Sequence, residues 1–523
     1  MNRRSLFAVV GLALLAWLFL AVANLFFGEL NQDEGWYLYA ARLVSDGQLP
    51  FRDFAFTQGP MFPLIYGFIQ PLIDACGVGG GRVFTALLGL LAAGAAASLA
   101  SRLAPPDRKI AAAALAFILV AVNVYHSYFT TVVKTYALCA VFLTKGLLAV
   151  VIARDRKSAW LFAWAGVVLA AAAATRITSG LALAGVGIWL LTQRRAYGDR
   201  AWIAFGLGGA LGLGLFIGVF HLLAPEAFRF FMLDYHAHRE VVGAWGAAAL
   251  KVGMLSRLTG GYFIAFALGA GLILARWTGL LRAEGPRDGL AVTGWLTLAG
   301  ILVVQAAAPF PYDDYQVPLF PVFAALLAVA LMRAPALARP QVAHAVLWIA
   351  LIVNGAAAIS SPINQAWMVV GRDRIWWRMR EKPALLQLRD AARAIRERSG
   401  DATELLTQDT YLAVESGLRV PAGWEMGIFG YYPELDHATA ERLHVRNRAM
   451  LHADIALSRA RVAALSEYAF SVAAPAVAPL PEEEQRALRG MVETRFAPAG
   501  EFSYFGQGNT RLRLYARDPD AAP

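Results

Sequence analysis

The chain has 523 residues, of which 58% are hydrophobic and only 16% charged, and its mean hydropathy is +0.51. Soluble domains carry about 25% charged residues, so this composition excludes an ordinary soluble protein and indicates a membrane protein. The formal charge of +10 lies largely in short loops between apolar runs, so we expect no nucleic-acid partner. The two cysteines, Cys76 and Cys139, cannot build a disulfide framework, and Cys139 lies within an apolar run.

Long apolar runs dominate the first two thirds of the chain. A run of about 17–25 residues can cross a bilayer core. Eleven such runs are predicted as membrane spans: 5–27, 82–103, 110–126, 131–152, 158–175, 178–193, 201–223, 259–281, 290–308, 316–333 and 341–360. The first run follows Arg3-Arg4 and is longer than the apolar part of a signal peptide, so we interpret it as a span.

The connecting loops predict the topology. Short basic loops mark the cytoplasmic side of a membrane protein, and here they alternate with loops that hold acids and aromatics. The basic set comprises Arg3-Arg4, Arg108-Lys109, Arg154/Arg156/Lys157, Arg194-Arg195/Arg200, Arg282/Arg287 and Arg333/Arg339. We therefore expect a cytoplasmic N-terminus, an outward first loop and an outward C-terminal domain. The predicted domains are 1–360 in the membrane and 361–523 outside it.

The first outer loop, residues 28–81, is too long for a simple connection. It begins with the adjacent acids Asp33 and Glu34, at the boundary between water and lipid. The segment Trp36–Leu43 predicts a helix lying along the interface. Pro60–Cys76 is apolar but interrupted by prolines, which favours a second interfacial or re-entrant helix over a span.

Several cations are predicted at the same outer face. Lys134 near the start of the fourth span and Arg176 after the fifth are candidates for holding a phosphate. Snorkelling to the interface explains Lys134 equally well, and membrane anchoring explains Arg176 equally well. Lys251 and Arg257 are further outer-face cations.

Two later outer loops add polar groups. The loop 224–258 holds Asp234, His236, His238 and Glu240, which form two i,i+4 pairs on a helix and could contribute to a divalent metal site or make polar contacts at the surface. Asp313 and Asp314 open the tenth span.

The composition changes near Arg380, and the remaining 140 or so residues suffice for an independent domain of mixed α and β structure. Its predicted elements are a charged helix over 381–399, a strand at 404–406, a helix over 411–417, a strand within 462–470 and a terminal strand over 511–515.

With these residues in place, the chain resembles the membrane-embedded GT-C glycosyltransferases, in particular the protein O-mannosyltransferase and aminoarabinose (lipid A) transferase superfamily. The resemblance rests on Asp33-Glu34 after the first span, the interfacial segment that ends at Pro50, and Phe51-Arg52-Asp53-Phe54 leading to Gln58-Gly59-Pro60. It implies a GT-C-like polytopic α-helical fold in a bacterial inner membrane. It also implies an enzyme that uses a polyprenyl-phosphate sugar and transfers the sugar with inversion on the non-cytoplasmic side.

The resemblance also assigns roles. Asp33 becomes the candidate general base and Glu34 a residue that positions the acceptor or Asp33. Cations must stabilise the leaving lipid phosphate, and the candidates are Arg176, Lys134, Arg52, Lys251 and Arg257. The acceptor or sugar candidates are Asp53, Gln58, Tyr37, His236, His238, Asp313 and Asp314. The acceptor itself, whether lipid, glycan or protein, stays open.

Two positions depart from the family pattern. Gln58 stands where aminoarabinose transferases have a metal-binding Glu, and Lys134 stands where many relatives have an acid, so a divalent metal is possible but no metal site is assigned. A polytopic transporter or lipid-linked-sugar flippase remains the main rival, although it predicts paired breaks at the bilayer midplane. A noncatalytic membrane scaffold is the third possibility.

Overall fold

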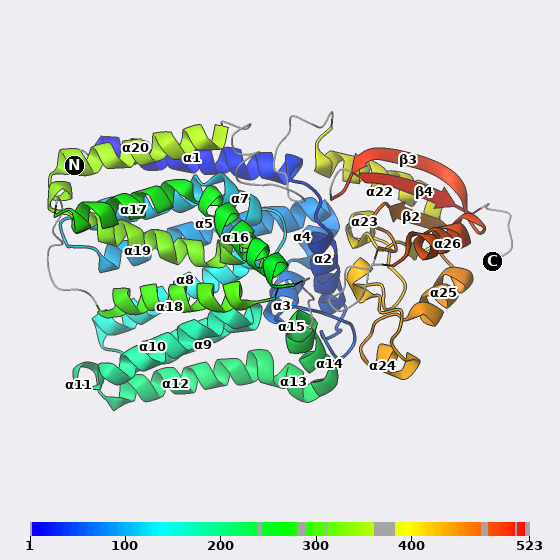
Figure 1. Cartoon of the computed structure of the whole chain (residues 1–523), viewed down its shortest axis with the longest axis horizontal. Coiled ribbons are helices and arrows are strands. Elements are labelled where there is room, and N and C mark those ends of the chain that lie inside the picture. Colours follow the sequence, from blue (N-terminus) through cyan, green and yellow to red (C-terminus); the bar gives the residue numbers. More distant parts are fainter. Residues whose placement is uncertain are drawn as a thin grey trace.

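The computed structural model describes residues 3–237, 243–279, 289–309, 311–359, 382–471, 480–507 and 510–517. Long helices lie side by side in one bundle, and a C-terminal region of mixed helices and strands covers one end of it (Figure 1). The N-terminus lies at the opposite end of the bundle, at the start of α1. The predicted fold class, a polytopic helical protein with a C-terminal α/β region, is confirmed.

The bundle is built from apolar helices joined by short connections. Its helices are α1 (Arg3–Phe27), α5 (Val78–Leu103), α6 (Lys109–Ala121), α7 (Val124–Phe129), α8 (Thr135–Arg156), α9 (Ala159–Thr175), α10 (Leu181–Thr192), α11 (Arg194–Tyr197), α12 (Asp199–Leu213), α13 (Val219–Leu223), α16 (Gly243–Gly261), α17 (Phe263–Trp277), α18 (Gly289–Ala307), α19 (Phe320–Met332) and α20 (Pro340–Ile359). Shorter helical turns are η1 (Ile177–Gly180), η2 (Gly214–Gly218), η4 (Asp313–Leu319) and η5 (Pro335–Ala338).

Each of the eleven predicted spans coincides with an apolar helix, but the helices differ in length. Within the described residues, seven helices are long and apolar enough to cross a membrane, or eight if the pair α16 and α17, bent by 91°, is one span. The predicted spans at 110–126, 158–175 and 178–193 correspond to shorter apolar helices. The first of these stops at Ala121, and Asn123 then caps a separate helix, α7. Eleven spans therefore remain a prediction.

The first outer loop forms three helices at the end of the bundle. These are α2 (Gln32–Ser45), α3 (Met61–Gly67) and α4 (Gln70–Cys76). The side chain of Asn31 accepts a hydrogen bond from the backbone N–H of Asp33 and so caps α2. Asp33 and Glu34 stand in the first turn, where the helix dipole favours acids. Both predicted interfacial segments are thus helical, the second one broken between Gly67 and Gln70.

Another set of short helices follows α13. These are α14 (Pro225–Arg229), the π-helical turn η3 (Phe230–Asp234) and α15 (Tyr235–Ala237). In Figure 1, α14 and α15 lie beside α2 and α3 at the end of the bundle that faces the C-terminal region. The outer loops therefore converge on a single end of the bundle.

The C-terminal region contains a four-stranded sheet with helices around it. Its elements are α22 (Ala384–Ser399), β1 (Leu405–Leu406), α23 (Thr410–Ser416), η7 (Gly427–Gly430), α24 (His437–Arg442), α25 (Arg448–Leu457), β2 (Val462–Ser466), α26 (Glu482–Glu493), β3 (Ala497–Phe505) and β4 (Thr510–Ala516). The strand order is β1-β2-β4-β3, with β1 parallel to β2 and the other pairs antiparallel. All five predicted elements exist, with bounds shifted by a few residues.

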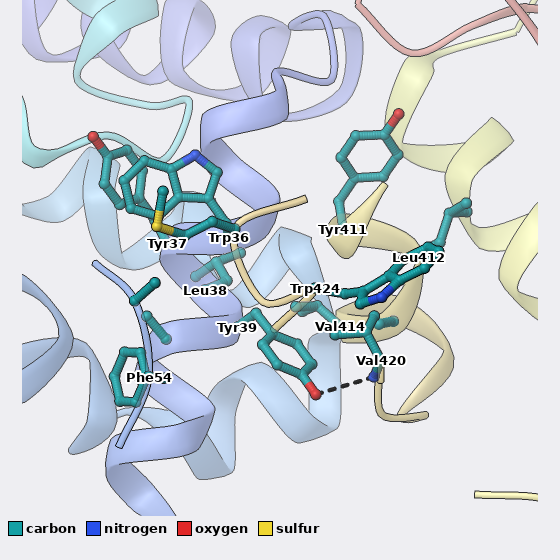
Figure 2. Close-up of a cluster of buried hydrophobic side chains, with 14 of the residues drawn as sticks. Trp36, Tyr37, Leu38, Tyr39, Phe54, Tyr411, Leu412, Val414, Val420 and Trp424 are labelled. Atoms are coloured by element: carbon teal, nitrogen blue, oxygen red, sulfur yellow. Dashed lines mark hydrogen bonds between the residues drawn. The ribbon is translucent and has the colours of Figure 1, made fainter. Parts of the chain in front are cut away.

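One hydrophobic core joins the C-terminal region to the first outer loop. Trp36, Tyr37 and Leu38 of α2 belong to the same buried cluster as Leu412 and Trp424. Figure 2 shows α2 side chains facing residues of α23 and the loop after it. The two parts of the chain therefore pack as one unit around α2.

Candidate active site

A cavity of about 410 Å³ lies where the outer loops meet the C-terminal region. Its walls come from α2, the loop before α3, the starts of α8 and η4, and the C-terminal region. The lining residues are Asn31, Gln32, Asp33, Trp36, Tyr37, Thr57, Gln58, Lys134, Tyr136, Arg176, Tyr235, His236, Tyr312, Asp314, Tyr315, Ile428, Phe429, Glu467, Tyr468, Ser471, Gln507 and Thr510. Sequence segments far apart in the chain thus meet in one polar and aromatic chamber.

Asp33 presents its carboxylate to this cavity. The side chain is 32% exposed, although its helix α2 is mostly buried. The indole N–H of Trp36 donates to Oδ1 over 3.3 Å, and the ammonium of Lys134 lies 3.6 Å from Oδ2. A carboxylate that is accessible and held in place by its neighbours has the geometry of a general base.

Glu34 lies in a different environment, and the structure does not bring it into the cavity. Its side chain is fully buried and forms a bidentate ion pair with Arg82, with N–O distances of 2.7 and 2.8 Å. Oε1 also accepts the backbone N–H of Val133. Glu34 is directed toward Arg82 of α5 and is not among the residues that line the cavity. The expected role of Glu34 in positioning the acceptor is not supported by this placement.

Lys134 stands between two acids. Its ammonium lies 3.6 Å from Asp33 and 3.2 Å from Oδ2 of Asp314, and the side chain is only 6% exposed. The other oxygen of Asp314, Oδ1, is buried and has no hydrogen-bond partner among the described residues. Lys134 therefore lines the cavity as a cation countered by two carboxylates, rather than snorkelling into solvent.

Arg176 is the second cation of the cavity. Its guanidinium lies over the rings of Tyr136 and Tyr315, at 4.8 and 4.6 Å from their centroids, and donates to Oγ1 of Thr135 over 3.0 Å. Its Nε is buried without a hydrogen-bond partner in the described part of the chain. No described carboxylate lies within ion-pair distance of it. Aromatic stacking thus fixes the plane of the guanidinium while its charge stays available to an anion.

Three further predicted residues line the cavity: Tyr37, Gln58 and His236. The imidazole of His236 lies 2.8 Å from the backbone carbonyl of Thr57. Burial, and then the neighbouring Asp33 carboxylate, raise the pKa of Tyr37 well above its usual range. The phenol therefore stays neutral and can only donate or accept a hydrogen bond.

Other predicted residues do not line the cavity. Arg52 and Asp53 pair with each other at the surface, and Asp53 also accepts the backbone N–H of Leu49, which closes the turn before them. Lys251 and Arg257 lie on α16 and are not among the lining residues. His238 lies outside the described residues, and for Asp313 only the backbone, at the start of η4, is described.

A smaller cavity of about 210 Å³ adjoins the first. The two share Gln58, Arg176, His236 and Tyr315. The rest of its wall is mainly apolar and comes from η1, η3 and the end of α18: Ile177, Thr178, Met232, Val304, Gln305 and Ala308. Arg176 therefore stands at the junction of a polar chamber and an apolar one.

The divalent metal left open by the sequence does not fit these residues. Among the residues that the structure describes, no three His, Cys, Asp or Glu side chains come together in a group. Gln58 offers a neutral amide, and the Lys134 ammonium occupies the space between the two nearest acids, Asp33 and Asp314. A divalent cation there would meet a like charge at close range. We derive no step that uses a metal.

The sequence predicted no individual residue of the C-terminal wall of the cavity. Glu467, Tyr468 and Ser471 follow β2, and Gln507 and Thr510 flank the turn between β3 and β4. It also missed the two tyrosines that hold Arg176. Nothing in the sequence distinguishes Tyr136 and Tyr315 from other aromatics at a membrane boundary.

The fold of the chain is shared by solved membrane proteins, as the resemblance noted in the first loop predicts. The chain is similar in fold to ArnT from Cupriavidus metallidurans solved bound to undecaprenyl phosphate, with a TM-score of 0.61, 14% identity and 100% of both chains covered. The same protein in its apo state gives a TM-score of 0.59 at 15% identity, with 97% of both chains covered. No protein-family model and no curated protein sequence matches the chain.

Proposed function

We propose that this protein is an inverting glycosyltransferase that moves a sugar from a polyprenyl-phosphate donor to an acceptor hydroxyl at the extracytoplasmic face of the membrane. The single observation that carries the proposal is the pair Asp33 and Arg176 in one cavity, an accessible carboxylate and a cation without a described acid partner. Single displacement at an anomeric carbon needs these two groups, a base for the attacking hydroxyl and a positive charge for the departing phosphate.

The donor is assigned from the smaller cavity and from the structural neighbour. The apolar wall formed by Ile177, Met232 and Val304 suits the first units of an isoprenoid chain, and Arg176 at its mouth suits the phosphate. ArnT from Cupriavidus metallidurans, which shares the fold, binds undecaprenyl phosphate. These two observations together support a polyprenyl phosphate rather than a soluble nucleotide sugar as the donor.

The reaction proceeds as one displacement. The acceptor oxygen attacks the anomeric carbon and its proton passes to a carboxylate oxygen of Asp33. The bond between that carbon and the phosphate oxygen breaks, and both bonding electrons leave with the polyprenyl phosphate. Arg176 offsets the negative charge that grows on the leaving phosphate. Lys134 pairs with Asp33 and helps to hold its carboxylate in place. Because attack and departure occur on opposite faces of the sugar, the configuration inverts.

The C-terminal wall of the cavity supports a role in acceptor binding. Glu467, Ser471 and Gln507 add polar groups to the larger cavity and do not line the smaller, apolar one. Membrane topology follows from the same proposal: the cavity, the outer loops and the C-terminal region share the extracytoplasmic side, and the N-terminus is cytoplasmic. A reporter fused after Arg339 should then be active only inside, and one fused after Pro523 only outside.

The proposal is tested with purified protein in proteoliposomes that contain ¹⁴C-labelled undecaprenyl-phosphate hexoses and pentoses, with a cell-envelope extract as the source of acceptor. A transferase releases polyprenyl phosphate and moves the label to the acceptor. A flippase moves the intact labelled lipid between leaflets and leaves the sugar–phosphate bond unbroken. If the label stays on the lipid with every donor tested, and the labelled lipid crosses the bilayer, the protein is a flippase and not a transferase.

A further inference from the structure

Gln32, the residue before Asp33, is bound by two side chains of the C-terminal region. Its amide Nε2 donates to Oδ1 of Asp409 over 2.6 Å, and its backbone N–H donates to Oε1 of Gln507 over 3.1 Å. Gln32 opens α2, so its backbone N–H is one that the helix itself cannot satisfy. The first turn of the helix that carries Asp33 is therefore tied to the C-terminal region at two points.

Asp409 is a fixed anchor for this link. It is 1% exposed and does not line the cavity. Besides Gln32, its carboxylate accepts hydrogen bonds from the hydroxyl of Tyr411 at 3.0 Å, from the hydroxyl of Ser466 at 3.0 Å and from the backbone N–H of Ser466 at 3.1 Å. Ser466 is the last residue of β2, at the centre of the sheet. Asp409 thus connects Gln32 directly to a central strand of the C-terminal sheet.

The surrounding contacts leave α2 little freedom to shift. A Cβ on Gly35 would lie 2.5 Å from the backbone nitrogen of Tyr411, which shows how closely α2 and α23 approach. One turn further along, the hydroxyl of Tyr39 accepts the backbone N–H of Val420 at 3.1 Å, the bond drawn in Figure 2. The C-terminal region thus contacts α2 along one side from Gln32 to Tyr39.

We propose that Asp409 is a positioning residue for catalysis: through Gln32 it holds the first turn of α2 so that the Asp33 carboxylate faces the cavity. The C-terminal region is then part of the active site rather than a cover attached to a complete membrane enzyme. The inference rests on the proposed function of Asp33. A misplacement of a reacting group by about 1 Å can cost about 10²-fold in rate. Asp409, which does not line the cavity, therefore controls turnover through Gln32 without touching substrate.

A charge swap tests the link. Gln32→Glu replaces the amide that lies 2.6 Å from the Asp409 carboxylate with a second carboxylate, and the two acids repel each other. At pH 8 we expect turnover to fall about 10- to 100-fold. Asp409→Asn alone should be mild, because the Gln32 amide can turn over and accept from the new NH₂ group. The double variant Gln32→Glu with Asp409→Asn restores a donor and an acceptor, and turnover should return to within about threefold of wild type.

Three measurements distinguish a misplaced Asp33 from a protein that has failed to fold. Turnover of the labelled donor, the Kd for undecaprenyl phosphate and the thermal unfolding midpoint are measured for all three variants. We expect turnover to change while the Kd stays within about threefold, since the lipid phosphate is held by Arg176 and not by Gln32. A Gln32→Glu enzyme with normal turnover would overturn the inference, as would a double variant no better than Gln32→Glu. If Asp33→Asn also turns over normally, the failure lies in the proposed function; if Asp33→Asn is inactive, it lies in the link alone.

Discussion

Glu34 and Arg82 form a bidentate ion pair in which both side chains are fully buried, one residue away from the exposed Asp33. Arg82 also donates to the backbone carbonyls of Leu25, Gly28 and Glu29, which are left without helical partners at the end of α1. The pair therefore locks the start of α2 against the end of α1 and the side of α5. The Asp33-Glu34 motif therefore combines Asp33, which we propose acts chemically, with Glu34, which holds the structure.

This arrangement predicts that Glu34→Gln lowers stability. Removing one partner of a buried ion pair leaves an uncompensated charge, which costs about 3–5 kcal/mol. We expect a lower yield of folded protein and a lower thermal unfolding midpoint, with the folded fraction still binding undecaprenyl phosphate. The double variant Glu34→Leu with Arg82→Met removes both charges and should be more stable than either single change. A fully stable but inactive Glu34→Gln enzyme would instead assign Glu34 a chemical role.

Arg176 is predicted to hold the donor phosphate. Arg176→Ala should raise the donor KM and the Kd for undecaprenyl phosphate at least tenfold, because a charge-assisted contact to an anion is lost. Arg52→Ala is the matched control: it removes the same side chain from a surface pair that does not line the cavity. Isothermal titration in detergent compares the two. Equal affinities for the two variants would place the phosphate elsewhere.

Metal removal provides a third prediction. Because the Lys134 ammonium already lies between Asp33 and Asp314, turnover should be unchanged after dialysis against EDTA and should not rise on addition of Mg²⁺ or Mn²⁺. Lys134→Met removes that cation and leaves two acids facing each other, so this variant should lose turnover and bind Mn²⁺ measurably, as detected by electron paramagnetic resonance. Wild-type activity that disappears with EDTA and returns with a metal contradicts this account.

The first loop could be predicted from the sequence because its signals are local. The aromatic run after Asp33 and the prolines at 63 and 71 each determine structure within a few residues. The different environments of Asp33 and Glu34 could not be predicted, because they depend on the ion pair between Glu34 and Arg82, some fifty positions away. Nothing in the sequence indicates that Arg82 is completely buried.

The rest of the cavity is formed by residues that are far apart in the sequence, and their contacts could not be predicted. Lys134 is predicted as a functional residue because a charged side chain near the membrane is energetically costly. Arg176 is predicted because its forked guanidinium suits a phosphate. Both residues line the cavity. Arg52, Lys251 and Arg257 have the same charge at the same predicted face and do not line it. Charge and depth along the chain cannot distinguish these cases, because only packing decides which cations point inward. The contributions of Asp409 and Gln507 depend on how the C-terminal sheet docks, which no local pattern encodes.

A pH effect on stability follows from Glu425, next to the buried Trp424. Burial raises the pKa of Glu425 from about 4.5 to about 7, and its Oε2 has no hydrogen-bond partner among the described residues. Folding therefore favours the protonated form, so its contribution is fully present below about pH 4.5 and is lost as pH rises through 7. Stability should increase by about 2 kcal/mol as pH falls from 8 to 5. Glu425→Gln should flatten this part of the profile, as measured by thermal unfolding at each pH.

The measurement that tests the central claim most directly is the turnover of Asp33→Asn with a labelled polyprenyl-phosphate sugar. The variant keeps the shape of the side chain and its contact with Trp36 but cannot accept a proton at ordinary pH. Loss of a positioned general base costs about 10²–10⁴-fold in rate, so we predict a fall of that size. The thermal unfolding midpoint and the affinity for undecaprenyl phosphate should match wild type, because Asp33 is partly exposed and the phosphate is held by Arg176. An Asp33→Asn enzyme that transfers sugar at the normal rate contradicts the account.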